Sequence, residues 1–186
     1  YATQLMEGKN ALVIPIGKKV GEYFSRRGYE LHTEKYHEAE GLYLEDAYDI
    51  AQMLTAMYRA GKIDEIRIVY TKFVSMLTQT PDDLKALPLN FSEELTEKPA
   101  AKETLYDPSM VEVLDVVVPQ YVGGLIYGAV TESFASEQGA RRTAMEAASD
   151  NADTMISDLN LKFNRARQAA ITQELTEIVS GANALQ

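Results

Sequence analysis

Apolar residues recur with helical spacing over a long stretch at the C-terminal end of the chain. Between Gly128 and Leu185 there is no proline, and the only internal glycines are Gly139 and Gly181. A helix of this length would run about 85 Å, against about 30 Å for the diameter of a small domain. A soluble chain forms such a rod only when something outside its own core covers the apolar stripe. We therefore expect the chemistry of this system to belong to a partner.

One face of this stretch carries the alternating spacing of three and four that is typical of a coiled coil, with one slip near Leu159. The eight residues of this predicted seam are Met145, Ala148, Ala152, Met155, Leu159, Phe163, Ala166 and Ala170. The alanines indicate that another helix approaches closely. Because no other segment of this chain is long enough to be that helix, we expect it to come from elsewhere.

The first 107 residues show the pattern of an α/β domain. Apolar runs, helical spacing and β-branched residues predict strand, helix, strand, helix and strand in residues 11–16, 18–28, 29–36, 47–58 and 65–80. Gly28 and Gly61 are expected to end the two helices. This order favours an open, largely parallel sheet with covering helices.

A polar, proline-rich segment over residues 81–108 separates this domain from the long helix, and we interpret it as a surface loop. Asp107 and Pro108 suit a helix start, because aspartate caps helices and proline is tolerated in the first turn. The predicted domains are therefore 1–107 and 108–186, with the long helix kinked near Pro119.

Composition excludes several classes of function. The 186 residues carry a formal net charge of −10, which argues against nonspecific nucleic-acid binding and against adhesion to anionic lipid. The chain has no cysteine, so disulfides, thiolate metal sites and cysteine nucleophiles are excluded. No uninterrupted apolar run approaches 18 residues, so we expect no membrane span. The chain begins at Tyr1 without an initiating Met, as a fragment or a truncated chain would.

Motifs for catalysis, cofactors or metals are nearly absent, and we predict no catalytic residue, no cofactor and no metal site. The turn Gly17-Lys18-Lys19 resembles a phosphate-binding turn, but it matches neither the dinucleotide nor the P-loop signature, so solvated lysines are the preferred interpretation. His32 and His37 are an odd number of residues apart. On a strand they would lie on opposite faces, which is unsuited to a shared metal.

Polar residues near the end of the rod have a different setting. Arg167 and Gln168 adjoin Ala169, Ala170 and Ile171, so this turn is apolar around part of its circumference. A helix that is apolar on several sides is normally enclosed. We therefore expect a partner to surround this turn.

The C-terminal segment closely resembles the gamma subunit of F-type ATP synthases. The matching residues include Ala135-Ser136-Glu137-Gln138, Ala144-Met145, Asp150-Asn151 and an almost uninterrupted string from Asn164 to Gly181. More loosely, IGKKVGEYF, LPL and LDVVVPQYVGGLIYGAV resemble the middle domain of the same family, so the resemblance covers about residues 11–186.

The resemblance implies a Rossmann-like α/β foot domain that binds no nucleotide, followed by a shaft helix that forms an antiparallel coiled coil in the family. Relative to the family, the N-terminal helix and the first strand of the domain are missing from this sequence. The subunit would be the central rotor shaft inside a ring of three alpha and three beta subunits, with no active site of its own. Its foot would engage the epsilon subunit and the membrane c-ring, at the cytoplasmic face of the bacterial plasma membrane.

The resemblance also assigns roles to individual residues. Those expected to touch the beta subunits, or the collar that holds the tip of the shaft, are Arg167, Gln168, Thr172, Glu174, Glu177, Ile178, Val179 and Leu185. Those expected near epsilon and the c-ring are Gln120, Tyr121 and Tyr127. Gly123, Gly124 and Gly139 stand where better helix formers are expected. Each glycine lowers helix stability by about 1 kcal/mol relative to alanine.

Two other hypotheses remain open. A coiled-coil adaptor with a non-catalytic α/β domain would also explain the rod, but it would have no need for the particular order of polar groups from Asn164 to Gly181. An enzyme that uses Gly17-Lys18-Lys19 for a phosphorylated ligand would bind nucleotide as the isolated chain.

Overall fold

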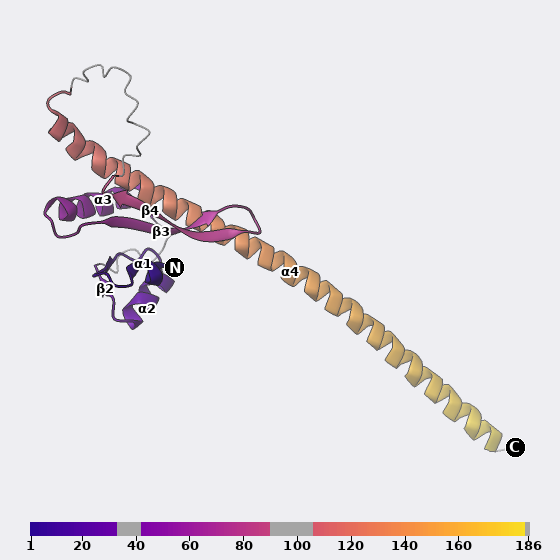
Figure 1. The fold of residues 1–186 in the computed structure, drawn as a ribbon. Coiled ribbons are helices and arrows are strands. Elements are labelled where there is room, and N and C mark those ends of the chain that lie inside the picture. The colour runs from indigo at the N-terminus through magenta and orange to yellow at the C-terminus, as the bar shows by residue number, and fades with distance from the viewer. Residues whose placement is uncertain (33–41, 90–105, 185–186) are drawn as a thin grey trace. The chain divides into compact units, whose positions relative to one another are not determined.

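The computed structural model describes residues 1–32, 42–89 and 106–184 (Figure 1). These residues form two compact units, Tyr1–Ala140 and Arg141–Gln186. The first unit contains small sheets and helices together with the beginning of a long C-terminal helix. The second unit consists of the remainder of that helix. The predicted class, an α/β domain followed by a very long helix, is confirmed.

The N-terminal part of unit 1 contains four short elements. Helix α1 (Ala2–Met6) leads into strand β1 (Leu12–Val13), and helix α2 (Lys18–Arg26) leads into strand β2 (Glu30–Leu31). The two strands are parallel, with Leu12 opposite Glu30 and Val13 opposite Leu31. Strand β1 ends before Pro15, as expected of a residue that cannot donate to a ladder. Gly28 follows α2 with a φ of 76°, which confirms its predicted role as the helix terminator.

Helix α3 (Leu44–Arg59) begins where the Asp46 carboxylate accepts a hydrogen bond from the main-chain N–H of Tyr43 at 3.1 Å. The helix presents Ala47 and Ala51 to the core, and both are fully buried. Gly61 follows it with a φ of 67°. The predicted helix over residues 47–58 and its glycine terminator are therefore confirmed.

Strand β3 (Ile66–Phe73) turns back into strand β4 (Gln79–Leu87), and the two are antiparallel. The prediction of one strand through residue 80 and a loop from residue 81 was wrong. The chain reverses between Ser75 and Thr78, and each of these two residues donates its N–H to the other's carbonyl. The Gln79 side-chain amide donates to the carbonyls of Ser75 and Met76 and closes the turn. The described strands form two small sheets, one parallel and one antiparallel, and not the single, largely parallel sheet that the sequence favoured. The difference arises because β3 pairs with the next strand through a hairpin instead of joining β1 and β2.

Helix α4 (Met110–Ala184) begins two residues later than the sequence indicated. Its first turn is capped by Ser109, whose hydroxyl accepts from the N–H of Glu112 and donates to the Glu112 carboxylate. This Ser-x-x-Glu arrangement caps the helix where Asp107 was expected to. Pro119 lies inside α4 and has no N–H to donate to the preceding turn. Both the kink at Pro119 and the domain boundary at residue 107 stay predictions.

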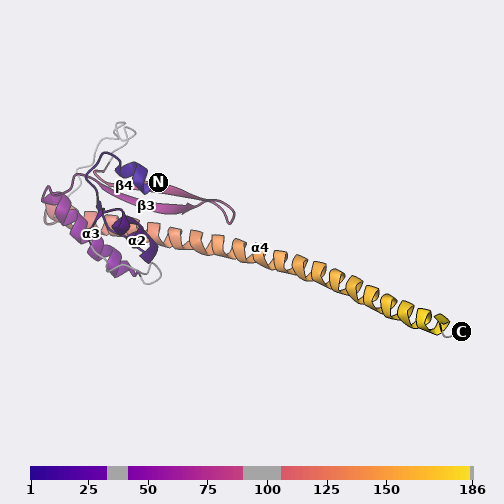
Figure 2. The same ribbon diagram turned by 90° about the horizontal axis from the view of Figure 1, so that it is seen from below.

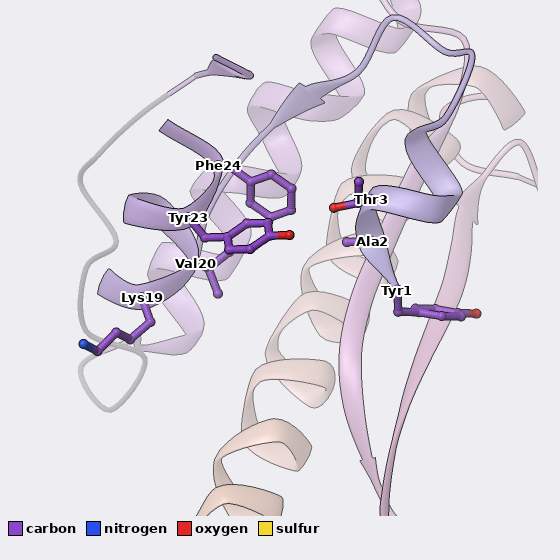
Figure 3. Close-up of a pocket in the computed structure, with 7 residues that line it drawn as sticks. All are labelled: Tyr1, Ala2, Thr3, Lys19, Val20, Tyr23 and Phe24. Atoms are coloured by element: carbon purple, nitrogen blue, oxygen red, sulfur yellow. The ribbon is translucent and has the colours of Figure 1, made fainter. Parts of the chain in front are cut away.

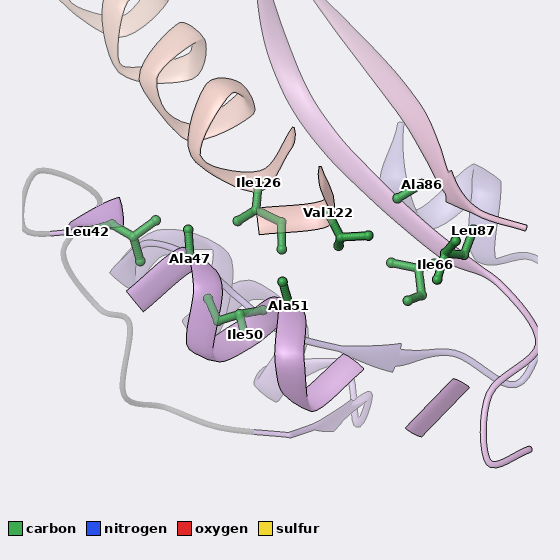
Figure 4. Close-up of a cluster of buried hydrophobic side chains, with 9 residues drawn as sticks. All are labelled: Leu42, Ala47, Ile50, Ala51, Ile66, Ala86, Leu87, Val122 and Ile126. Carbon is green, nitrogen blue, oxygen red and sulfur yellow. The ribbon is translucent and has the colours of Figure 1, made fainter. Parts of the chain in front are cut away.

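The core of unit 1 lies where α3, the β3–β4 hairpin and the first part of α4 meet (Figure 2 and Figure 4). It consists of Leu42, Ala47, Ile50, Ala51, Ile66, Ala86, Leu87, Val122 and Ile126. Part of α4 is long and apolar enough to cross a membrane by length and composition alone, and 22% of that stretch is buried. Because Val122 and Ile126 belong to the core, packing within unit 1 accounts for part of this apolar character.

Gly123 determines how closely α3 approaches α4. A Cβ atom added there would lie 2.2 Å from Cδ1 and 3.3 Å from Cα of Tyr48. Gly124 has nothing within 4 Å of an added Cβ, and Gly139 would meet Phe73 Cε2 at 3.2 Å. Two of the three glycines that look like poor helix formers are therefore sites of close packing.

A charged network joins Tyr1, the residue before α1, to the β3–β4 hairpin. The Tyr1 hydroxyl donates to Asp83 Oδ1 at 2.7 Å, and the Arg67 guanidinium donates to the carboxylates of both Glu65 and Asp83. The pKa of Asp83 is lowered, first by the Tyr1 hydrogen bond and then by Arg67. The pKa of Glu65 is lowered chiefly by its hydrogen bond from Arg67. Both carboxylates are therefore more stable as anions in the folded state.

Gly123→Ala is expected to lower the free energy of unfolding by roughly 1–2 kcal/mol. The Tyr48 ring can rotate away from the new methyl group, but its Cα cannot, and the cost of overpacking exceeds the gain in helix propensity. The matched control, Gly124→Ala, should raise the free energy of unfolding by up to about 1 kcal/mol, because its methyl group enters open space. Urea unfolding followed by circular dichroism measures both. Equal effects of the two substitutions would show that α3 does not pack against Gly123.

Arg67→Met is expected to make the free energy of unfolding less dependent on pH in the acidic range. With both carboxyl pKa values below their unfolded values, the network stabilises the fold above about pH 4, and this contribution is lost as the pH falls through the folded pKa values. The variant should lose about 1 kcal/mol or less at pH 7, because the network is partly exposed. Its unfolding free energy should also decline less steeply below pH 4. The control Lys18→Met removes an exposed cation elsewhere and should retain the wild-type slope of unfolding free energy against pH. Parallel curves of unfolding free energy against pH for the wild type and both variants would refute the role of Arg67.

Candidate functional site

The second unit is a single helical segment whose described side chains are exposed from Met145 to Gly181. Its geometry is set by the helix alone, because the residues of this unit that the structure describes belong to α4. Side chains three and four residues apart share a face. The site can therefore be built from helical position, exposure and local hydrogen bonds.

The predicted seam lies along one face of this segment and is uncovered. Met145, Met155, Leu159 and Phe163 are each between 64% and 66% exposed. From Met145 to Ala170 the seam extends about 38 Å. Soluble proteins rarely expose a continuous apolar surface of this length, so the seam has the character of an interface. The antiparallel partner helix stays a prediction.

The chemistry of the face changes after Ala170. Continuing the seam by four and then three residues leads to Glu174 and Glu177, which are exposed carboxylates. The apolar residues of the last turns, Ile171, Leu175 and Ile178, lie on a neighbouring face and are 49%, 58% and 69% exposed. The end of the helix is therefore suited to different surroundings from those of the seam.

The polar groups of the last turns are partly organised by the helix itself. The Thr172 hydroxyl donates to the main-chain carbonyl of Gln168 at 2.9 Å, and the Gln173 amide donates to Glu177 Oε1 at 3.0 Å. Within the part of the chain that the structure describes, Arg167 makes no ion pair. Arg167 and Gln168 thus present a cation and an amide on the exposed surface of the helix.

The residues predicted to face epsilon and the c-ring lie in unit 1. Gln120, Tyr121 and Tyr127 are exposed on the first third of α4. Gln120 also lines a cleft between α3 and α4, where Arg59 and Asp115 form an exposed ion pair. The roles assigned to these three residues stay predictions.

The remaining residues assigned to the collar lie at the far end of α4. Val179 is 57% exposed, and Leu185 lies outside the described residues. The roles assigned to the collar residues also stay predictions.

The turn at Gly17 leads from β1 into α2, as the sequence indicated, and places Lys18 and Lys19 on the surface. Lys19 borders a cleft of about 300 Å³ between α1 and α2 (Figure 3). Its lining is mostly apolar and aromatic, with Tyr23 and Phe24 in edge-to-face contact. This cleft offers one cation to a ligand and favours apolar contact.

No cluster of three or more possible metal ligands occurs among residues 1–32, 42–89 and 106–184. His32 is exposed and donates its main-chain N–H to the Val13 carbonyl, whereas His37 lies outside the described residues.

Three polar residues of α4, to which the sequence pattern assigned no contact, bind main-chain groups of β3: Glu132, Ser133 and Ser136. Polar residues on a helix carry no sequence signal for such long-range contacts.

Comparison with known proteins gives consistent matches over the chain. A family model described as ATP synthase matches residues 2–185. An ATP synthase gamma chain from Ruminococcus albus is 50% identical, over 94% of this chain and 60% of the relative. One from Alkaliphilus metalliredigens is 45% identical, over 98% of this chain and 64% of the relative. The chain thus spans less than two thirds of the length of these relatives.

Two further matches extend the comparison. A relative from Acetobacterium woodii, named as a sodium ion specific ATP synthase gamma chain, is 38% identical, over 97% of this chain and 66% of the relative. Among solved structures, the central stalk and c-ring structure of Tetrahymena thermophila mitochondrial ATP synthase matches with a TM-score of 0.56 and 19% identity. That match covers 80% of this chain and 66% of the other chain, and it supports the fold.

Proposed function

Because the chain belongs to the ATP synthase gamma-chain family, we propose that it is a central rotor shaft that couples ion-driven rotation to conformational cycling of catalytic beta subunits. In this proposal the chain is a non-catalytic subunit with no active site and no cofactor of its own. The reaction, ATP synthesis or hydrolysis, takes place in the subunits around it.

The observation that carries this proposal is the uncovered apolar surface of the second unit. Three of its large apolar side chains, Met155, Leu159 and Phe163, are about two thirds exposed. Burial of such side chains stabilises by about 1.5–3 kcal/mol each. A partner helix on the seam and a surrounding collar at the tip would supply that burial.

The shaft acts by making different contacts with each conformation of a beta subunit, which shifts their populations. A complete shift from 1:99 to 99:1 requires about 5.5 kcal/mol of differential binding. One hydrogen bond to a charged group contributes about 1.5–3 kcal/mol. The contact of Arg167 alone therefore supplies too little differential binding energy for this shift. Contacts of Gln168, Thr172 and further residues would supply the rest, which suits an extended polar turn better than a single residue.

The proposed partners are three alpha and three beta subunits around the shaft, with epsilon and the c-ring at the foot. Gln120, Tyr121 and Tyr127 would face epsilon or the c-ring. The location is then peripheral, at the cytoplasmic face of the bacterial plasma membrane. The residues that would meet the collar are Glu174, Glu177, Ile178, Val179 and Leu185.

Native mass spectrometry of the complex purified through this chain tests the proposal. We expect one copy of the chain with three copies each of two larger subunits. A monomer or a small homo-oligomer would contradict the proposal and favour a coiled-coil adaptor.

Arg167→Ala combined with Gln168→Ala is expected to lower the rate of coupled ATP synthesis about tenfold or more while leaving subunit assembly intact. The reason is the loss of charge-assisted contacts that distinguish the beta conformations. Lys162→Ala, which removes an exposed cation about one turn earlier, is the matched control and should retain the wild-type rate. Unchanged synthesis in the double variant would refute the assigned role of this turn.

A further inference from the structure

The outer edge of β3 faces α4. On its other side β3 pairs with β4, where Thr71 lies opposite Pro81. Proline has no N–H to donate. It is therefore tolerated in a strand where the main-chain groups of the opposite residue point away from it. Both main-chain groups of Thr71 do so, because they bond to side chains of α4.

Three α4 side chains bind this edge and form what we call the edge clamp: Glu132, Ser133 and Ser136. Ser133 Oγ accepts from the Thr71 N–H at 3.0 Å, and the Ser136 hydroxyl donates to the Thr71 carbonyl at 3.1 Å. Glu132 Oε1 accepts from the Phe73 N–H at 3.1 Å. Ser136 is only 2% exposed. The edge clamp provides hydrogen-bond partners for main-chain N–H and C=O groups that an edge strand otherwise leaves unpaired.

A second close contact between α4 and the hairpin lies one turn beyond the edge clamp. Gly139 has no side chain, and an added Cβ would lie 3.2 Å from Phe73 Cε2 and 3.6 Å from Met76 Sδ. The end of the hairpin can therefore lie close to the helix. Directional hydrogen bonds and close packing occur together at this contact.

We propose that the edge clamp is the joint that transmits torque between the foot and the shaft, an inference that rests on the proposed rotor function. Apolar contacts are non-directional and allow sliding, whereas hydrogen bonds hold a defined geometry. The Arg59–Asp115 ion pair also joins α3 to α4, but its side chains are 62% and 45% exposed and it is screened by salt. The clamp is the better shielded of these polar contacts.

The test uses the full-length rotor chain in the assembled complex, with Ser133→Ala and Ser136→Ala combined. Hydrogen exchange of the Thr71 amide should accelerate about tenfold, because its acceptor is lost. Angular fluctuations between a probe on the foot and a probe on the shaft should broaden. Thr131→Ala is the matched control, because the Thr131 hydroxyl donates to the Tyr127 carbonyl of its own helix. Glu132→Gln retains an acceptor oxygen and should behave like the wild type.

Unchanged exchange in the double variant would show that the clamp does not form. Faster exchange with unchanged angular fluctuations would show that the clamp only covers the strand edge, and would overturn its role in torque. If the double variant does not assemble, Ser133→Ala alone removes the acceptor of the Thr71 amide and is judged by the same two readouts. Failure of the wild-type complex to rotate would instead overturn the proposed function, and the torque role with it.

Discussion

The close approach of α3 and the β3–β4 hairpin to the first part of α4 is the contact on which unit 1 depends. The helix offers Val122 and Ile126 to the core, and Gly123 lets Tyr48 come near. A larger residue at position 123 would separate the helices and expose the core. The cost of glycine in a helix, about 1 kcal/mol, is offset here by close packing.

The same helix then changes its role along its length. In unit 1 some of its apolar residues, including Val122 and Ile126, are buried against segments of the same chain, whereas in unit 2 residues such as Leu159 and Phe163 are exposed. Helical periodicity is similar in both parts, so periodicity alone does not distinguish internal packing from an interface. The difference arises because the core of unit 1 takes up α4 residues such as Val122 and Ile126.

Local patterns predicted α3 and its glycine terminator, because these depend on residues close in sequence. The coiled-coil role of the seam rests on the same kind of pattern and stays a prediction. Strand β4 was missed because Pro81, Asp82 and Asp83 resemble a loop. In the structure Pro81 needs no hydrogen bond toward Thr71, and Asp83 is bound by Tyr1 and Arg67. The turn between the two strands also lacks the glycine or asparagine typical of tight hairpins. These features depend on long-range contacts that periodicity does not report.

Two parts of α4 offer different kinds of interaction, and the proposed rotor role would make use of both. Near the foot, Ser133 and Ser136 bind main-chain groups, and such bonds fix one orientation. At the other end, Ile171, Leu175 and Ile178 present apolar surface, which binds without a strong preference for one register. In the proposed rotor, the shaft would be held where torque enters and would slip where it turns inside its bearing. The hydrogen bonds to β3 would serve the first purpose, and the exposed apolar surface of the last turns would serve the second.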